Sequence, residues 1–227
     1  MNVIKQLPNI FTLCNLLMGF LSIISSINGQ YDMACYYIVI SGLFDTIDGK
    51  LARIFNATTI FGKQIDSLAD IISFCLAPCI LIYMLYVNDM VFGQFISFVP
   101  LMFGAIRLAR FNSAIDGFEK YTNSYFSGLP VPMFAFTTIA LIMTSNHSEV
   151  VLFVILFLSV LMVSKVEYAK VPSFKLNISK ENNIRLFILT ISIIFFLMSI
   201  LFNMEFYVLL CFVIMYIISG FMLRSKK

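Results

Sequence analysis

The chain has no tryptophan, a single histidine and only 12% charged residues among its 227 positions. A soluble domain is about one quarter charged, so this sequence has too few charged side chains to cover a water-exposed globule. Hydrophobic residues make up 60% of it, and the mean hydropathy is +0.96. This composition predicts an all-α membrane protein, a polytopic helix bundle formed by one domain.

Cysteine is also scarce, and its placement argues against a disulfide framework or a zinc site. All five cysteines lie within apolar stretches: Cys14, Cys35, Cys75, Cys79 and Cys211. Cys75 and Cys79 would share a helical face, but no histidine or further cysteine is placed to complete a metal site. We therefore interpret them as small buried hydrophobes.

Apolar segments that approach the ~20 residues needed to span a bilayer recur along the chain. They predict about eight transmembrane helices, at 9–27, 31–54, 64–86, 90–111, 128–145, 149–165, 184–203 and 205–223. The first segment has no small-x-small cleavage site, so we expect an uncleaved span rather than a signal peptide.

The basic residues support this count and set the orientation. With eight spans, all 15 lysines and arginines fall on one side of the membrane. The opposite connections contain as ionisable groups only Asp32, Asp89, His147, Glu149 and Glu205. The positive-inside rule then predicts that the basic side is cytoplasmic, with both termini on that side, in a multi-pass protein of the cell (inner) membrane.

Four aspartates break the apolar pattern at the facing ends of the second and third spans. They belong to the sequence D-x-x-D-G-x-x-A-R-x8-G-x-x-x-D-x-x-x-D, as Asp45, Asp48, Asp66 and Asp70. Each pair is spaced i,i+3 or i,i+4 and so shares a helix face, and two antiparallel helices would bring the pairs together. Clustered carboxylates cannot neutralise one another, so divalent cations such as Mg²⁺ are the expected partners.

The same stretch contains residues suited to a phosphate ligand. Gly49, Ala52 and Gly62 are small enough for a helix or a ligand to approach the backbone, and Arg53 at the span end can reach a phosphate. The residues alone leave a second class open, because a cation or proton transporter could also use four aspartates in this way.

At these eight positions the chain resembles the CDP-alcohol phosphotransferases, integral membrane enzymes of phospholipid synthesis. The resemblance implies a six-helix core, two divalent metal ions (Mg²⁺ or Mn²⁺) and a homodimer. It implies that Asp45, Asp48 and Asp66 hold metal and help bind the CDP diphosphate, and that Asp70, close to the second metal, is the general base. The only histidine, His147, is predicted on the far side of the membrane, so a carboxylate has to accept the proton.

Three further stretches resemble the members that use serine as the acceptor alcohol. They are LPNIFTLCNLLMGF near the start, RLARFN at 107–112 and FSGLPVP at 126–132, and VSKVEYAKVPSFK fits more loosely. The expected substrates are therefore CDP-diacylglycerol and serine, in the lipid bilayer and without nucleic acid. Glycerol 3-phosphate or inositol phosphate remain alternative acceptors, because the basic connection at 165–180 could bind a phosphorylated alcohol.

The remaining site predictions concern both substrates. Arg107 and Arg110 share a face at the inner end of the fourth span, and one of them is expected to bind the serine carboxylate or the lipid phosphate, since a guanidinium matches a carboxylate in shape. Thr12 and Asn15, i,i+3 in the first span, are weaker candidates for the diphosphate. The resemblance covers residues 1–175, the expected core, and residues 176–227 are expected to add two C-terminal transmembrane helices.

Overall fold

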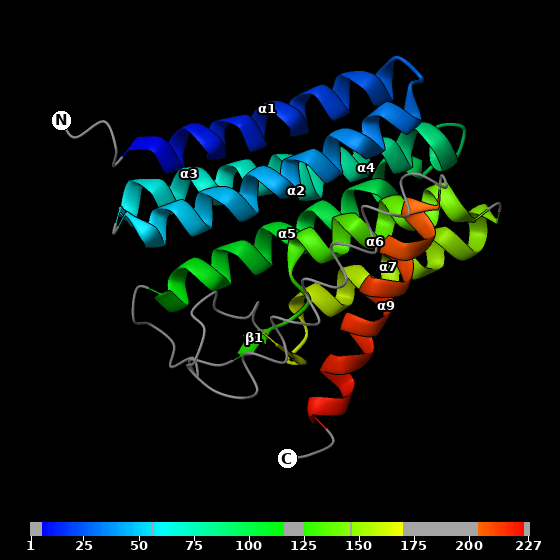
Figure 1. The fold of residues 1–227 in the computed structure, drawn as a ribbon. Coiled ribbons are helices and arrows are strands. Elements are labelled where there is room, and N and C mark those ends of the chain that lie inside the picture. The colour runs from blue at the N-terminus through cyan, green and yellow to red at the C-terminus, as the bar shows by residue number, and fades with distance from the viewer. Residues whose placement is uncertain (1–5, 56, 116–124, 146, 170–203, 225–227) are drawn as a thin grey trace.

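The computed structural model describes residues 6–55, 57–115, 125–145, 147–169 and 204–224. The elements, in chain order, are α1 (Leu7–Ile27), α2 (Tyr31–Ile54), α3 (Ile60–Asp70), η2 (Ile71–Leu76), α4 (Ala77–Ile82), η3 (Tyr83–Val87), α5 (Gly93–Ile115), β1 (Tyr125–Ser127), α6 (Val131–Thr144), α7 (Ser148–Val163), β2 (Glu167–Ala169) and α9 (Glu205–Arg224). Figure 1 shows the long helices packed side by side, with α1 and α2 forming an antiparallel hairpin.

The first helix has the reverse of a soluble amphipathic pattern. Its buried face is small and polar: Pro8, Thr12, Asn15, Gly19, Ser22, Ser25 and Ser26. Its exposed face is apolar: Ile10, Leu13, Leu17, Phe20 and Ile24. Small residues let membrane helices approach closely, and the Ser22 hydroxyl donates to the carbonyl of Ala34 on α2 at 2.9 Å. The apolar outer face is suited to lipid.

The segment from α3 to η3 is one continuous apolar helix over Ile60–Val87, interrupted by two π-helical turns. The first of these turns, η2, begins directly after Asp70. Such turns occur frequently at functional sites. Ser73, Phe74 and Cys75 in η2 are buried, so the helix passes from the acidic cluster into the protein core within this turn.

The core is formed mainly by α4, α6 and α7 together with η2. Its largest fully buried side chains include Phe74, Leu81, Phe134, Ile139 and Met162. Hydroxyl groups in this apolar region bond their own helix: Thr138 donates to the carbonyl of Phe134 at 2.9 Å and Ser159 to that of Ile155 at 2.7 Å. This back-bonding satisfies a polar group where water is absent.

A short two-stranded ribbon joins the ends of these helices. β1 and β2 pair antiparallel, with Phe126 opposite Tyr168. Gly128 follows β1 with a φ of 81°, and a Cβ there would contact the carbonyl of Met162, so this turn needs glycine. The ribbon adds six strand residues to the predicted all-helical fold, because the polar connections fold back on each other instead of remaining loops.

The predicted helical bundle is confirmed as a class. Among the described residues, three helices are long and apolar enough to cross a membrane: Leu7–Ile27, Ile60–Val87 and Gly93–Ser113. Shorter apolar helices cover Val131–Thr144, Ser148–Val163 and Phe206–Ile218. The predicted span at 184–203 lies outside the described residues, and the total of eight spans stays a prediction.

Candidate active site

The second half of α2 contributes the first two aspartates. Asp48 is buried, with 4% of its surface exposed, while Asp45 is half-buried. One turn earlier, Gly42 lies against the ring of Phe136, where a Cβ would collide. This close approach holds α2 against α6 and fixes where Asp45 and Asp48 lie.

The second half of α3 contributes Asp66. Thr59 caps this helix, and its side chain accepts a hydrogen bond from the Gly62 amide at 2.9 Å. This is an ordinary N-cap arrangement. One residue after Asp66, Ser67 and Asn112 bond each other, with the Asn112 amide donating to the Ser67 hydroxyl at 3.0 Å. The register of α3 relative to α5 is therefore fixed beside the acidic residue.

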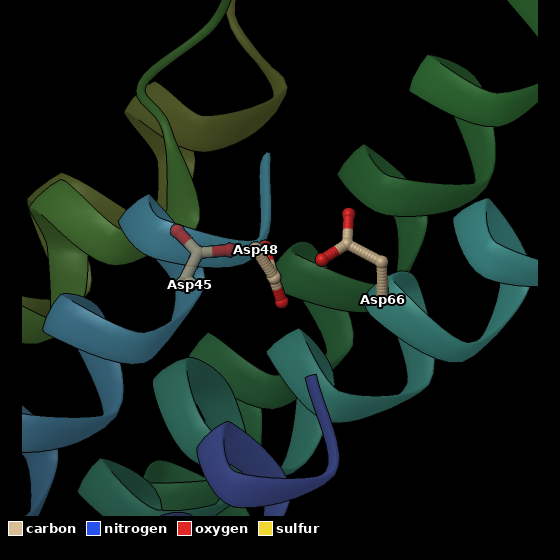
Figure 2. Close-up of side chains that lie close together, drawn as sticks. All are labelled: Asp45, Asp48 and Asp66. Carbon is tan, nitrogen blue, oxygen red and sulfur yellow. The ribbon is translucent and has the colours of Figure 1, made fainter. Parts of the chain in front are cut away.

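The three carboxylates of Asp45, Asp48 and Asp66 converge between α2 and α3. One oxygen from each lies within 4.8 Å of those of the other two, and Figure 2 shows the Asp66 carboxylate directed toward Asp48. The Oδ2 atom of Asp48 is buried without a hydrogen-bond partner among the described residues. A buried anionic oxygen without a partner is costly. Three carboxylate oxygens this close together, one of them buried without a partner, fit a hard divalent cation, which takes carboxylate ligands.

Asp70 lies beside this group rather than within it. Its side chain is close enough to Asp45 for the two carboxyl groups to share a hydrogen bond. The Asn15 amide donates to its Oδ1 atom at 3.5 Å, the outer limit of such a bond, and the charge of Arg107 acts on it. All four predicted aspartates are therefore in one neighbourhood, with Asp70 on the side that faces α1 and α5.

The polar face of α1 lies against this neighbourhood through Thr12 and Asn15. Thr12 is within hydrogen-bonding reach of Asp48 and also donates to the carbonyl of Pro8 at 3.1 Å. Asn15 is fully buried, and its Oδ1 atom has no hydrogen-bond partner among the described residues. Both side chains are thus placed where a ligand of the acidic cluster could contact them.

The small residues of the motif differ in how open they are. At Gly49 the nearest atom to an added Cβ is Arg53 Nη2 at 3.9 Å, so the backbone is accessible. Arg53 is exposed and Ala52 is half-buried. Gly62 is tighter, since an added Cβ would lie 3.2 Å from Asn9 Oδ1 on α1. Asn9 is not among the site residues predicted from the sequence.

The two arginines of α5 have different surroundings. Arg110 donates to two backbone carbonyls, to Val163 at 2.9 Å and to Ser127 at 3.3 Å, and so ties α7 to the ribbon. Arg107 is buried, with 7% exposed, and its Nε atom has no hydrogen-bond partner among the described residues. Their i,i+3 spacing did not indicate this difference.

The single histidine lies at another end of the bundle. His147 is exposed and directly precedes α7 at the α6–α7 turn. Figure 1 shows the α6–α7 turn at the same end of the bundle as the α1–α2 turn. The aspartates lie toward the other end of α2, near its connection to α3. That no histidine serves the acidic site stays a prediction.

Fold and site together define a membrane-embedded helical protein with a carboxylate centre suited to divalent metal. Comparison with known proteins names the family: residues 5–164 match the model of the CDP-alcohol phosphatidyltransferase family, and the chain belongs to it. The matched range contains all four aspartates and both arginines.

Curated relatives carry more specific names. The chain is 36% identical over 200 residues to a CDP-diacylglycerol–serine O-phosphatidyltransferase of Helicobacter pylori, covering 84% of this chain and 80% of that protein. It is 38% identical over 168 residues to the archaetidylserine synthase of Methanothermobacter thermautotrophicus, covering 73% and 70%. A yeast CDP-diacylglycerol–serine O-phosphatidyltransferase from Saccharomyces cerevisiae is 32% identical over 149 residues, covering 61% and 52%.

Proposed function

We propose that this protein transfers the phosphatidyl group of CDP-diacylglycerol to the hydroxyl group of L-serine, giving phosphatidylserine and CMP. The observation that carries the proposal is the gathering of Asp45, Asp48 and Asp66 beside Asp70, with the buried Arg107 next to Asp70. The family membership and the names of the relatives support the reaction and the acceptor.

The first part of the mechanism is binding of the nucleotide diphosphate. Asp45, Asp48, Asp66 and Asp70 would hold two divalent ions, Mg²⁺ or Mn²⁺. When bound, these ions neutralise the charge that develops on the diphosphate as CMP leaves. The open backbone at Gly49 lets the diphosphate approach α2, Ala52 and Gly62 add little bulk on α2 and α3, and Arg53 offers a cation at the rim. Thr12 and Asn15 supply polar contacts from α1.

The second part is attack by the acceptor. The serine hydroxyl oxygen forms a bond to the phosphorus that carries diacylglycerol, and the bond from this phosphorus to the CMP oxygen breaks. Asp70 accepts the hydroxyl proton, because general-base catalysis needs a group within hydrogen-bond reach and Asp70 lies on the α5 side of the cluster. Arg107 binds the serine carboxylate and thereby directs the hydroxyl toward Asp70. Arg110 supports this region through its two backbone carbonyls.

The arrangement in the membrane forms the rest of the proposal. We expect eight spans, with the active site, the basic connections and both termini on the cytoplasmic side of the cell membrane. Residues 1–175 form the catalytic core, with six helices, and residues 176–227 add two more spans. The apolar outer faces of several helices are compatible both with lipid and with a homodimer interface.

The test is an acceptor panel. Purified protein in detergent, supplied with CDP-diacylglycerol and Mg²⁺ or Mn²⁺, is assayed with serine, glycerol 3-phosphate, inositol phosphate and ethanolamine. We expect CMP release to depend on serine and to yield phosphatidylserine. Product formation only from a phosphorylated alcohol would reject the acceptor while retaining the chemistry. Ion flux in liposomes without CMP release would reject transferase activity.

A further inference from the structure

Two elements that pack on the bundle lie beyond the part of the chain matched to the family. The family model ends at residue 164, whereas β2 covers Glu167–Ala169 and α9 covers Glu205–Arg224. α9 packs against α6 and β2, and Figure 1 shows it crossing beside α6 and α7. These elements are called the tail below.

The tail contributes a pair of stacked tyrosines. The rings of Tyr168 on β2 and Tyr216 on α9 lie 5.5 Å apart between centroids, with 16° between their planes. Tyr168 is fully buried, and its phenol oxygen has no hydrogen-bond partner among the described residues. Burial raises the pKa of Tyr168 to about 12, so the phenol stays neutral at physiological pH. An offset pair of this kind is a rigid support.

Arg107 connects this pair to the acidic cluster. Tyr216 and Asp70 both lie within electrostatic range of the Arg107 guanidinium. Arg107 on α5 is therefore a neighbour both of Tyr216 in the tail and of Asp70 in the acidic group. A guanidinium stacks readily on aromatic rings, so an aromatic neighbour can restrict its orientation while leaving its donors available for a ligand.

The unpartnered atom on Arg107 identifies the kind of ligand. Its Nε–H group is buried and lacks an acceptor among the described residues, and a buried donor of this kind costs free energy until it is paired. An anionic group with a planar fork, such as a carboxylate, fits this donor. Asp70 is already close to Asp45 and accepts from Asn15, which leaves the donor suited to a carboxylate supplied by the substrate.

We propose that the tail completes the acceptor pocket, and that Tyr216, supported by Tyr168, is a positioning residue that holds Arg107 to receive the carboxylate of an amino-acid acceptor. The inference rests on the proposed function and goes beyond it. The four aspartates and Arg107 lie in the part matched to the family, whereas the two tyrosines that would orient Arg107 toward an amino acid lie outside that part.

The experiment compares two leucine substitutions on one helix. Tyr216→Leu removes the ring beside Arg107, and Tyr207→Leu removes an α9 tyrosine that is 53% exposed. We expect Tyr216→Leu to raise the KM for serine by about 10-fold or more. This is the effect of losing one hydrogen bond to a charged group, here the bond between a misplaced Arg107 and the serine carboxylate. The KM for CDP-diacylglycerol should stay within about twofold. Tyr207→Leu should resemble the wild type in both.

Two conservative variants keep the test decisive if Tyr216→Leu does not fold. Tyr216→Phe retains the ring and should raise the serine KM less than the leucine variant does. Tyr168→Phe tests the support, and it should also raise the serine KM selectively. The preference for serine over ethanolamine should fall in each affected variant, because ethanolamine lacks the carboxylate that Arg107 binds.

The outcomes separate this inference from the proposed function. Serine-dependent CMP release by the wild type, with unchanged serine KM in the Tyr216 and Tyr168 variants, would overturn the inference alone. Equal increases in the KM of both substrates would also overturn it, since a general loosening of the fold would act on both. A wild type that does not use serine would reject the proposed function and this inference with it.

Discussion

The hydroxyl of Ser73 donates a 3.0 Å hydrogen bond to the backbone carbonyl of Asn15, and so joins η2 to α1. The Asn15 side chain in turn donates to Asp70 at 3.5 Å. The contact is possible because Gly19 faces Ser73 one turn further along α1, where an added Cβ would lie 2.7 Å from Ser73 Cα. The position of Asn15 beside Asp70 therefore depends on the absence of a side chain at residue 19.

Gly19→Ala should destabilise the protein and impair transfer, because the new methyl group meets backbone rather than a flexible side chain. Overpacking of this kind typically costs 1–3 kcal/mol, and we expect about that loss. Thermal unfolding in detergent measures it. Gly49→Ala is the matched control, since its nearest neighbour is 3.9 Å away. It should keep the wild-type unfolding temperature but weaken binding of CDP-diacylglycerol, and a large loss of stability there would contradict the open backbone.

Asp45→Asn, Asp48→Asn and Asp66→Asn should each abolish transfer. A neutral amide cannot replace a carboxylate ligand to a hard cation, and the three oxygens lie close enough together to share one. Chelation should silence the wild type, and added Mg²⁺ or Mn²⁺ should restore it, as measured by CMP release. Full activity of the wild type in excess chelator would refute metal dependence.

Asp70→Asn should separate binding from turnover. General-base catalysis contributes ~10²–10⁴-fold, so kcat should fall by at least about that factor if Asp70 accepts the serine proton. Binding of CDP-diacylglycerol in the presence of metal should persist, as measured by equilibrium binding of the labelled lipid. Comparable loss of lipid binding would instead make Asp70 chiefly a metal ligand.

Arg107→Ala should change the serine KM, whereas Arg110→Ala should change the stability of the fold. Removal of Arg107 should raise the serine KM sharply with little change for CDP-diacylglycerol, because its buried Nε–H donor has no other partner among the described residues. Removal of Arg110 leaves the carbonyls of Val163 and Ser127 without a donor, which costs about 1–3 kcal/mol if they stay buried. It should therefore lower the unfolding temperature. The prediction is wrong if Arg107→Ala leaves the serine KM unchanged, or if Arg110→Ala keeps the wild-type unfolding temperature.

Much of the fold could be predicted from the sequence because span length and residue spacing act locally. The predicted span at 31–54 coincides with α2, and that at 205–223 ends one residue before α9 does. Asp45, Asp48 and Asp66 could be placed together because helical spacing and a short antiparallel connection leave few alternatives. The third span begins at Ile60 rather than at residue 64, since the Thr59 cap starts the helix before the apolar run.

The rest depends on contacts between distant residues. Arg107 and Arg110 are equivalent by spacing. Only because α7 and β1 approach α5 does Arg110 donate to the backbone carbonyls of both elements, while Arg107 does not. Nothing near Tyr216 in the sequence indicates that it stacks on Tyr168, 48 positions earlier. Ser67 and Asn112 likewise meet only through tertiary packing. Asn112 stands within the RLARFN stretch, so its motif was recognised but its partner was not.

The π-helical turn after Asp70 sets the rotational phase between two halves of one helix. Each residue of an α-helix advances the chain by about 100° around the axis, so one residue more or fewer in Ile71–Leu76 would turn one half by about that angle. Either Asp66 and Asp70 would leave the cluster or Phe74 would leave the core. The length of this turn is therefore fixed by geometry, whatever side chains it carries, and a single-residue deletion within it should be as damaging as the loss of one of the four aspartates.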